Sequence, residues 1–237
     1  MIQIQPSDSD LEKLIMPDGG QYYAETYPER FFVEPWNALS SLLLILPAVY
    51  WAYRLRGRYS DYPFIFFCIV LLALGGMGST LFHAFRSSSI LLYMDVLPMA
   101  LLTLSVGAYF WQKVSGSWWV ALLIVLSSLL LRILVIDYFA FQMAGRLYYL
   151  ISGLVIFVPM LIIMIRTKLR KGKLVLAALF LLLISLLFRE IDTWPGQPLP
   201  MGTHFLWHAF SAAGAFYLAS YLFYVENSKN QSRKADH

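Results

Sequence analysis

Charge is scarce in this 237-residue chain: only 14% of its residues are charged, whereas 59% are apolar. A soluble domain carries about a quarter charged residues, so this composition cannot cover a water-facing surface. The mean hydropathy of +0.63 agrees with a chain that lies in a bilayer. Since seven spans of roughly 20 residues would use about 140 residues, little of the chain remains for a separate soluble catalytic domain.

Cysteine is nearly absent too, and the single one, Cys68, excludes an intramolecular disulfide and a cysteine-based metal site. Residues 1–36 contain seven acids but no short apolar core, so we do not expect a signal peptide there. The net charge of +4 does not imply nucleic acid as a partner, because Lys and Arg orient the helices of a membrane protein.

Long apolar runs make up most of the chain. They are continuous and about twice as long as the strands of a transmembrane barrel, so they predict an all-α integral membrane protein, a seven-transmembrane helix bundle. The runs cover residues 37–53, 62–85, 90–111, 118–136, 147–165, 174–188 and 203–225. We therefore divide the chain into a polar acidic N-terminal segment (1–36), a transmembrane domain (37–225) and a short polar C-terminal tail (226–237).

The basic residues predict the orientation of this bundle. Seven spans place the termini on opposite sides, and cytoplasmic loops carry an excess of Lys and Arg. With the N-terminus outside, twelve of the eighteen basic residues fall in the inner loops and tail. We expect the N-terminus outside, the C-terminus in the cytoplasm, and a multi-pass location in the cell membrane of a bacterium or the ER or Golgi membrane of a eukaryote.

Ionisable residues within apolar runs are few, and each is a candidate functional residue because charge is costly in hydrocarbon. Three of the four histidines fall there. His204 and His208 are four residues apart, so both rings lie on one face of a helix and can share a metal ion. His83, near the end of the second run, has a similar predicted depth.

Two further residues share that depth: Asp95 in the third run, and Ser79, one helical turn before His83. Three histidines beside a carboxylate match a catalytic zinc site that leaves a fourth position for water. Asp95 would be a general base, or an acceptor that fixes an imidazole tautomer. Ser79 would form a hydrogen bond to a developing oxyanion or to the metal-bound water.

Other interpretations of these residues fit less well. A lone intramembrane His or Asp often only joins two helices, but three histidines, an Asp and a Ser at one depth make this explanation poorer. Two histidines on one helix face do not suit haem, and the sequence contains no His-Glu-x-x-His. The seventh run holds no lysine that could form a retinal Schiff base.

Glycines in Gly75-Gly76-x-Gly78 predict a close helix approach beside Ser79.

The motifs resemble those of the seven-helix alkaline ceramidases, which are related to adiponectin-type receptors, haemolysin III and Per1-like proteins. The similar segments are Gly78-Ser79-Thr80-Leu81-Phe82-His83-Ala84, Asp95-Val96-Leu97-Pro98, His204-Phe205-Leu206-Trp207-His208, Glu34-Pro35-Trp36-Asn37-Ala38-Leu39-Ser40-Ser41 and Arg189-Glu190-Ile191-Asp192.

The resemblance implies a zinc-dependent hydrolase that cleaves the amide of ceramide, or of a related N-acyl lipid, into a fatty acid and a sphingoid base. His83, His204 and His208 would hold zinc, Asp95 would take the proton of water, and Ser79 would stabilise the oxyanion. The substrate would enter from the bilayer, between the helices. A zinc-dependent lipid esterase or phospholipase and a zinc-containing receptor of the adiponectin-receptor type are the alternatives.

The resemblance also implies calcium as a second cofactor. Alkaline ceramidases carry an acidic N-terminal stretch that can bind Ca²⁺ near the zinc, and Glu34 is similar to its last acid. Hard oxygen ligands suit this ion. An acidic, solvated segment without a metal is the alternative for these residues.

Overall fold

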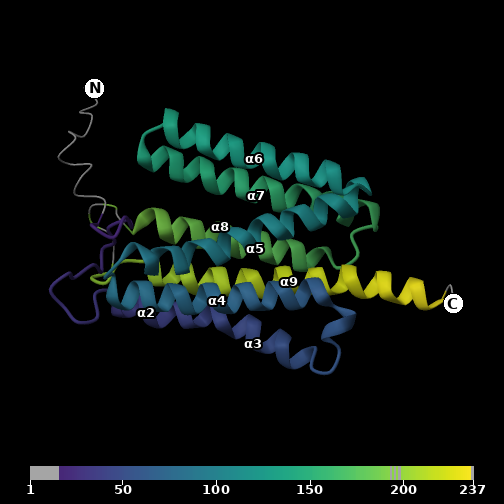
Figure 1. The fold of residues 1–237 in the computed structure, drawn as a ribbon, viewed down its shortest axis with the longest axis horizontal. Helices are drawn as coiled ribbons and strands as arrows, with labels where there is room; N and C mark the ends of the chain where they lie inside the picture. Colours follow the sequence, from purple (N-terminus) through teal and green to yellow (C-terminus); the bar gives the residue numbers. More distant parts are fainter. Residues whose placement is uncertain (1–15, 193, 195, 197–198, 236–237) are drawn as a thin grey trace. The chain divides into compact units, whose positions relative to one another are not determined.

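The structure is a computed structural model of the chain, shown in Figure 1. It describes residues 16–192, 194, 196 and 199–235, except for the side chains of residues 141, 142 and 229–235. The chain forms two compact units, which we treat separately. The first comprises Met1–Met99 and Phe180–Phe216, and the second Ala100–Leu179 and Tyr217–His237.

The part of the chain that the structure describes is helical and contains no β-strand, as predicted. The helices are α2 (Pro35–Ser41), α3 (Ile45–Arg54), α4 (Pro63–Phe85), α5 (Ser89–Ser115), α6 (Trp118–Tyr138), α7 (Phe141–Arg166), α8 (Gly172–Ile191) and α9 (His204–Ala235). Short 3-10 turns, Leu42–Leu44 and Tyr59–Asp61, lie between α2 and α3 and between α3 and α4.

Six of these helical stretches are long and apolar enough to cross a membrane, with α2 and α3 counting as one stretch, Pro35–Arg54. These lengths and compositions indicate a multi-pass membrane protein. Each predicted run forms a helix, but α9, which carries two histidines and a polar end, is not among the six. The seventh crossing therefore stays a prediction. Helix α9 also continues through 226–235, where we expected a tail.

In the first unit, α2, α3 and α4 lie side by side (Figure 1). The break between α2 and α3 has a local cause: Pro47 has no N–H for the carbonyl of Leu43, and the 3-10 turn lies at that carbonyl. Helix α4 begins at Pro63 and ends at Arg86, whose φ of 45° is left-handed. This ending places the Arg86 side chain just beyond the last turn of α4.

Helix α4 approaches α5 very closely, which confirms the prediction from its glycines. A Cβ atom at Gly78 would overlap the carbonyl of Met94, and one at Gly75 would lie 2.6 Å from the sulfur of Met99. Pro98 lies inside α5 and has no N–H for the Met94 carbonyl, so this carbonyl is free of its usual helical bond. The contact brings the backbone on either side of Ser79 and Asp95 together.

In the second unit, α6 and α7 pack along each other, with Val135, Ala144 and Ile151 in their common core. Arg132 is buried in α6, and its guanidinium lies 4.7 Å from the centre of the Tyr148 ring. This contact gives the buried cation an aromatic face. None of the predicted site residues belongs to this unit.

Candidate metal centre

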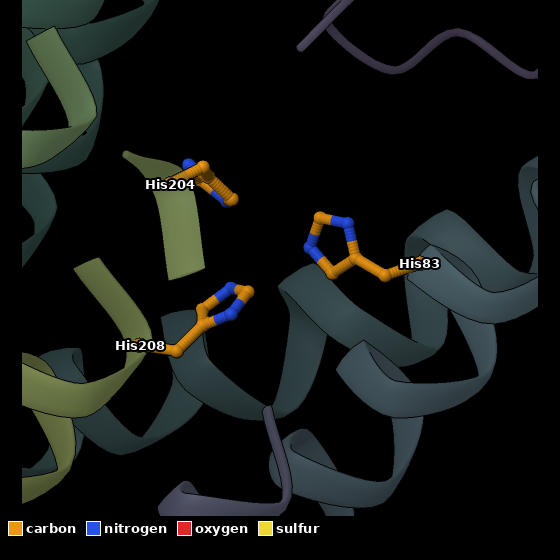
Figure 2. Close-up of side chains that lie close together, drawn as sticks. All are labelled: His83, His204 and His208. Atoms are coloured by element: carbon orange, nitrogen blue, oxygen red, sulfur yellow. The ribbon is translucent and has the colours of Figure 1, made fainter. Parts of the chain in front are cut away.

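Three histidine rings converge in the first unit. His83 comes from the last turn of α4, and His204 and His208 come from the first two turns of α9. Figure 2 shows the three rings turned toward one common space. One nitrogen from each ring lies within 4.8 Å of the other two, and all three residues are buried. One metal ion could therefore be held by all three, as the spacing predicted.

The orientation of His83 is set by Glu34. Its Nδ1 lies 2.5 Å from Glu34 Oε2, and both side chains are fully buried. A carboxylate can only accept, so Nδ1–H donates this hydrogen bond and the lone pair of Nε2 is free. A carboxylate behind a metal-ligating histidine is the usual way to fix its tautomer and raise its basicity.

Serine hydroxyls fix His208 in the same way. Its Nδ1 lies 2.8 Å from Ser40 Oγ and 3.3 Å from Ser41 Oγ. Ser40 Oγ donates its only proton to the carbonyl of Asn37, so it accepts a hydrogen bond from Nδ1–H of His208. The Nε2 atom of His208 is thereby left to bind a metal.

His204 differs, because its Nδ1 is buried and has no hydrogen-bond partner among the described residues. A buried polar atom without a partner is costly. A metal ion bound among the three rings could be coordinated by this imidazole, so the donor set fits a metal. Imidazole nitrogens suit Zn²⁺ as well as other first-row ions.

Asp192 holds the beginning of α9 in place. Its Oδ1 accepts hydrogen bonds from the backbone N–H of Thr203 (2.6 Å) and His204 (2.9 Å), and its Oδ2 accepts one from Ala24 (3.1 Å). A carboxylate at a helix N-terminus satisfies orphan N–H groups and complements the helix dipole. Gly202, with φ of 73°, leaves room for it, because a Cβ there would overlap Asp192.

Ser79 and Asp95 are joined by a hydrogen bond, in which the Ser79 side chain interacts with the Asp95 carboxylate. Ser79 Oγ also lies 3.0 Å from Ser41 Oγ, one of the hydroxyls beside His208. Ser79 is buried, whereas Asp95 is only partly so. A continuous polar chain therefore runs from Asp95 through the serines to His208.

Residues 16–34, which we name the strap, lie against the same histidines. The Tyr23 ring centre is 3.9 Å from that of His204 and 5.5 Å from that of His83. Glu25 accepts the N–H groups of Trp36 and Asn37 at the start of α2. Burial raises the pKa of Glu25, although these two bonds oppose the shift.

Glu34 ends the strap, and both of its carboxylate oxygens are occupied. Oε1 accepts from Thr26 and Arg86, and Oε2 accepts from His83 and Asn37. Burial acts to raise the pKa of Glu34, but the hydrogen bond from His83, the charge of Arg86 and the hydrogen bond from Thr26 hold it below its ordinary value. These described contacts give the expected calcium ion no support.

Sequence reasoning missed several of these groups. Ser40 and Ser41 belong to the Glu34–Ser41 segment that resembles the ceramidase motif, and their only other signal was two adjacent serines at the start of a span. Asp192 was similarly noted without a role. No sequence pattern indicated Arg86, because its contacts join the end of α4 to residues more than fifty positions away.

Fold and site together define a class: a helical, multi-pass membrane protein with a buried three-histidine group that could hold a metal ion. The Ceramidase family model matches residues 25–237, which is most of the chain. The chain therefore belongs to the Ceramidase family, as its motifs indicated. No curated protein matches the chain significantly.

Proposed function

We propose that this protein is an intramembrane zinc-dependent amide hydrolase that cleaves ceramide, or a related N-acyl lipid, into a fatty acid and a sphingoid base. The observation that carries the proposal is the buried convergence of His83, His204 and His208 in a chain of the Ceramidase family. Membership of this family favours an amide over an ester bond, and an enzyme over a receptor.

The three histidines would hold the zinc ion through one nitrogen each. For His83 and His208 this is Nε2, since their Nδ1 atoms bond Glu34 and Ser40. When bound, the ion would act as a Lewis acid and lower the pKa of a coordinated water to about 7. Glu34 and Ser40 keep the rings oriented, so the site is formed before substrate arrives.

Asp95 would transfer the proton, and Ser79 would stabilise the negative charge that develops on the substrate. Asp95 would accept the proton of the attacking water and return it to the amide nitrogen, which must be protonated to leave as an amine. Ser79 has one hydroxyl proton. Once Asp95 is protonated it no longer needs the bond from Ser79, so that hydroxyl is free to donate to the carbonyl oxygen as its charge grows.

The test is metal analysis of the purified full-length protein, combined with mass spectrometry of lipid products. Ceramides, phospholipids and N-acyl amino lipids would each be offered. We expect one zinc per chain and release of fatty acid and sphingoid base from ceramide. His204→Ala should lose both zinc and turnover, whereas Phe205→Ala, on the next residue of α9, should keep the zinc.

The results separate the alternatives. Wild-type protein without zinc would overturn the mechanism. Zinc with release of fatty acid from phospholipid alone would indicate an esterase, and zinc without turnover of any lipid would favour a receptor. In each of these cases the amide hydrolase proposal is wrong.

We further propose that the substrate reaches this site from the bilayer and that the centre lies toward the outer face. The site residues of α4 are near its C-terminal end, whereas Arg54, Arg56 and Arg58 precede its N-terminal end. A helix of 23 residues is about 35 Å long, so these two sets would lie at opposite membrane faces. The basic set is expected on the cytoplasmic side.

A further inference from the structure

Arg86 lies at the centre of a buried set of oxygen atoms beside the metal centre. Its Nε and Nη2 donate to the two carboxylate oxygens of Asp18 at 2.8 and 2.9 Å. Its Nη1 donates to Glu34 Oε1 at 2.6 Å and to the backbone carbonyl of Gln21 at 2.7 Å. The Arg86 side chain is only 1% exposed. The guanidinium thus has two acids and a carbonyl as partners.

These oxygens are the kind that a calcium ion would use: carboxylates and a backbone carbonyl. Here these oxygens accept hydrogen bonds from the N–H groups of the Arg86 guanidinium. This planar group can bind a carboxylate through two parallel hydrogen bonds. The guanidinium is also enclosed, because it lies 4.7 Å from the centre of the Phe82 ring. A Cβ at Gly20 would lie 2.6 Å from Nη2, so the strap passes directly over it.

The Arg86 side chain cannot easily leave this cluster. Arg86 is the C-cap of α4, and its left-handed backbone conformation directs the chain away from the helix. Burial acts to lower the pKa of Arg86, but its bonds to Asp18 and Glu34 and their charges raise it, so the group stays charged. Arginine keeps its charge at any pH at which the protein is folded.

We propose that Arg86 is the built-in cation of this cluster and takes the place of a calcium ion. It joins Asp18 and Glu34, near the two ends of the strap, to the end of α4, and through Glu34 it holds His83, so it is a positioning residue for the metal centre. The same link keeps Tyr23 against His83 and His204. Strap closure in this protein therefore does not depend on calcium. Only the activity readout below rests on the proposed function.

The experiment compares full-length wild type, Arg86→Ala and Arg86→Lys with the matched control Arg30→Ala. Arg30 is an exposed strap arginine that lies over Tyr27. Two readouts need no activity: the melting temperature, and cleavage after the exposed Glu29 by a glutamate-specific protease. Each is measured with and without millimolar Ca²⁺, guanidinium or urea, and zinc content and ceramide turnover are measured alongside.

In the wild type we expect Ca²⁺ to change neither readout. In Arg86→Ala, which leaves two buried carboxylates without their cation, we expect a lower melting temperature and roughly hundredfold faster cleavage. Guanidinium should restore protection in part, and urea should not. Lysine keeps the charge but loses the fork, so Arg86→Lys should be intermediate. Arg30→Ala should match the wild type.

Two results would overturn the proposal. One is protection of the wild type by Ca²⁺ that Glu34→Gln abolishes, since a calcium ion would then bind the cluster. The other is an Arg86→Ala protein, or an Arg86→Lys protein if the alanine variant does not fold, that behaves like Arg30→Ala. If the strap readouts of all variants are as expected but no variant, the wild type included, turns over ceramide, the result would instead count against the proposed function alone.

Discussion

Glu34 joins two parts of the centre that the sequence treated separately: the acidic N-terminal stretch and the histidine ligands. It is completely buried and bonds both His83 and Arg86. We predict that Glu34→Gln lowers the affinity for zinc by about 10- to 100-fold, the usual effect of losing the acceptor behind a ligating imidazole. Competition with a chelating dye measures this affinity.

The matched control is Glu29→Gln, an exposed acid of the same strap. It changes the charge of the strap by the same amount without touching a ligand. A Glu34→Gln protein that binds zinc as tightly as the wild type would show that Glu34 does not tune His83. Equal losses would show that only the overall negative charge matters.

The hydroxyl of Ser79 is expected to stabilise the developing oxyanion, and removing this hydroxyl tests that role. We predict that Ser79→Ala lowers kcat by about 10²- to 10³-fold, because one donor to the developing oxyanion is lost. The zinc content and KM should change little. Thr80→Ala is the control, because the Thr80 hydroxyl donates to the carbonyl of Gly76 within its own helix. A fall in kcat shared by both variants, or seen in neither, would contradict the assigned role.

At the scale of helices, the contact between α4 and α5 places Ser79 beside Asp95. We predict that Gly78→Ala destabilises the protein by about 1–3 kcal/mol, because the new methyl group would overlap the Met94 carbonyl. Gly153→Ala is the control: it lies inside α7, with nothing within 4 Å of its Cβ. Alanine there should stabilise the helix by about 0.5–1 kcal/mol.

Thermal unfolding of the two variants in the same detergent measures the difference. If Gly78→Ala is as stable as Gly153→Ala, the two helices are not in backbone contact at this point. A loss of turnover larger than the loss of folded protein would show that the contact also sets the distance between Ser79 and Asp95.

Helix periodicity explains how much of this site the sequence could predict. The spacing of His204 and His208 fixes both rings on one face of α9, and counting residues from the helix ends gives the depth of His83. Neither argument fixes the rotation of one helix against another. Nothing in the sequence therefore placed Glu34 behind His83: the resemblance connected it with a calcium ion, and a solvated acidic segment was the alternative. Ser40 and Asp192 had no predicted partners.

The contacts of Arg86 show the same limit more sharply. Asp18 and Arg86 are 68 positions apart, and their meeting depends on how the strap folds back over α4. Charge content alone indicated an acidic segment, and only the resemblance connected it with a calcium ion. Only the folded chain shows which cation lies there.

At the scale of the whole molecule, the outstanding prediction is the orientation in the membrane. Composition supports an N-terminus outside, since twelve basic residues would then face the cytoplasm. The structure supplies two exposed probe positions near opposite ends of α4: Glu29 in the strap, which bonds the end of α4 through Val33 and Ala84, and Ser60, just before Pro63. Replacing Cys68 with Ala removes the only native thiol.

In that background we predict that Glu29→Cys reacts with a membrane-impermeant maleimide in intact cells, whereas Ser60→Cys reacts only after the cells are permeabilised. A tag after His237 should likewise be reached only from the cytoplasmic side. The reverse labelling of the two cysteines would place the histidine centre at the inner face. Substrate would then come from the cytoplasmic leaflet, because α4 carries His83 at one end and its basic loop at the other.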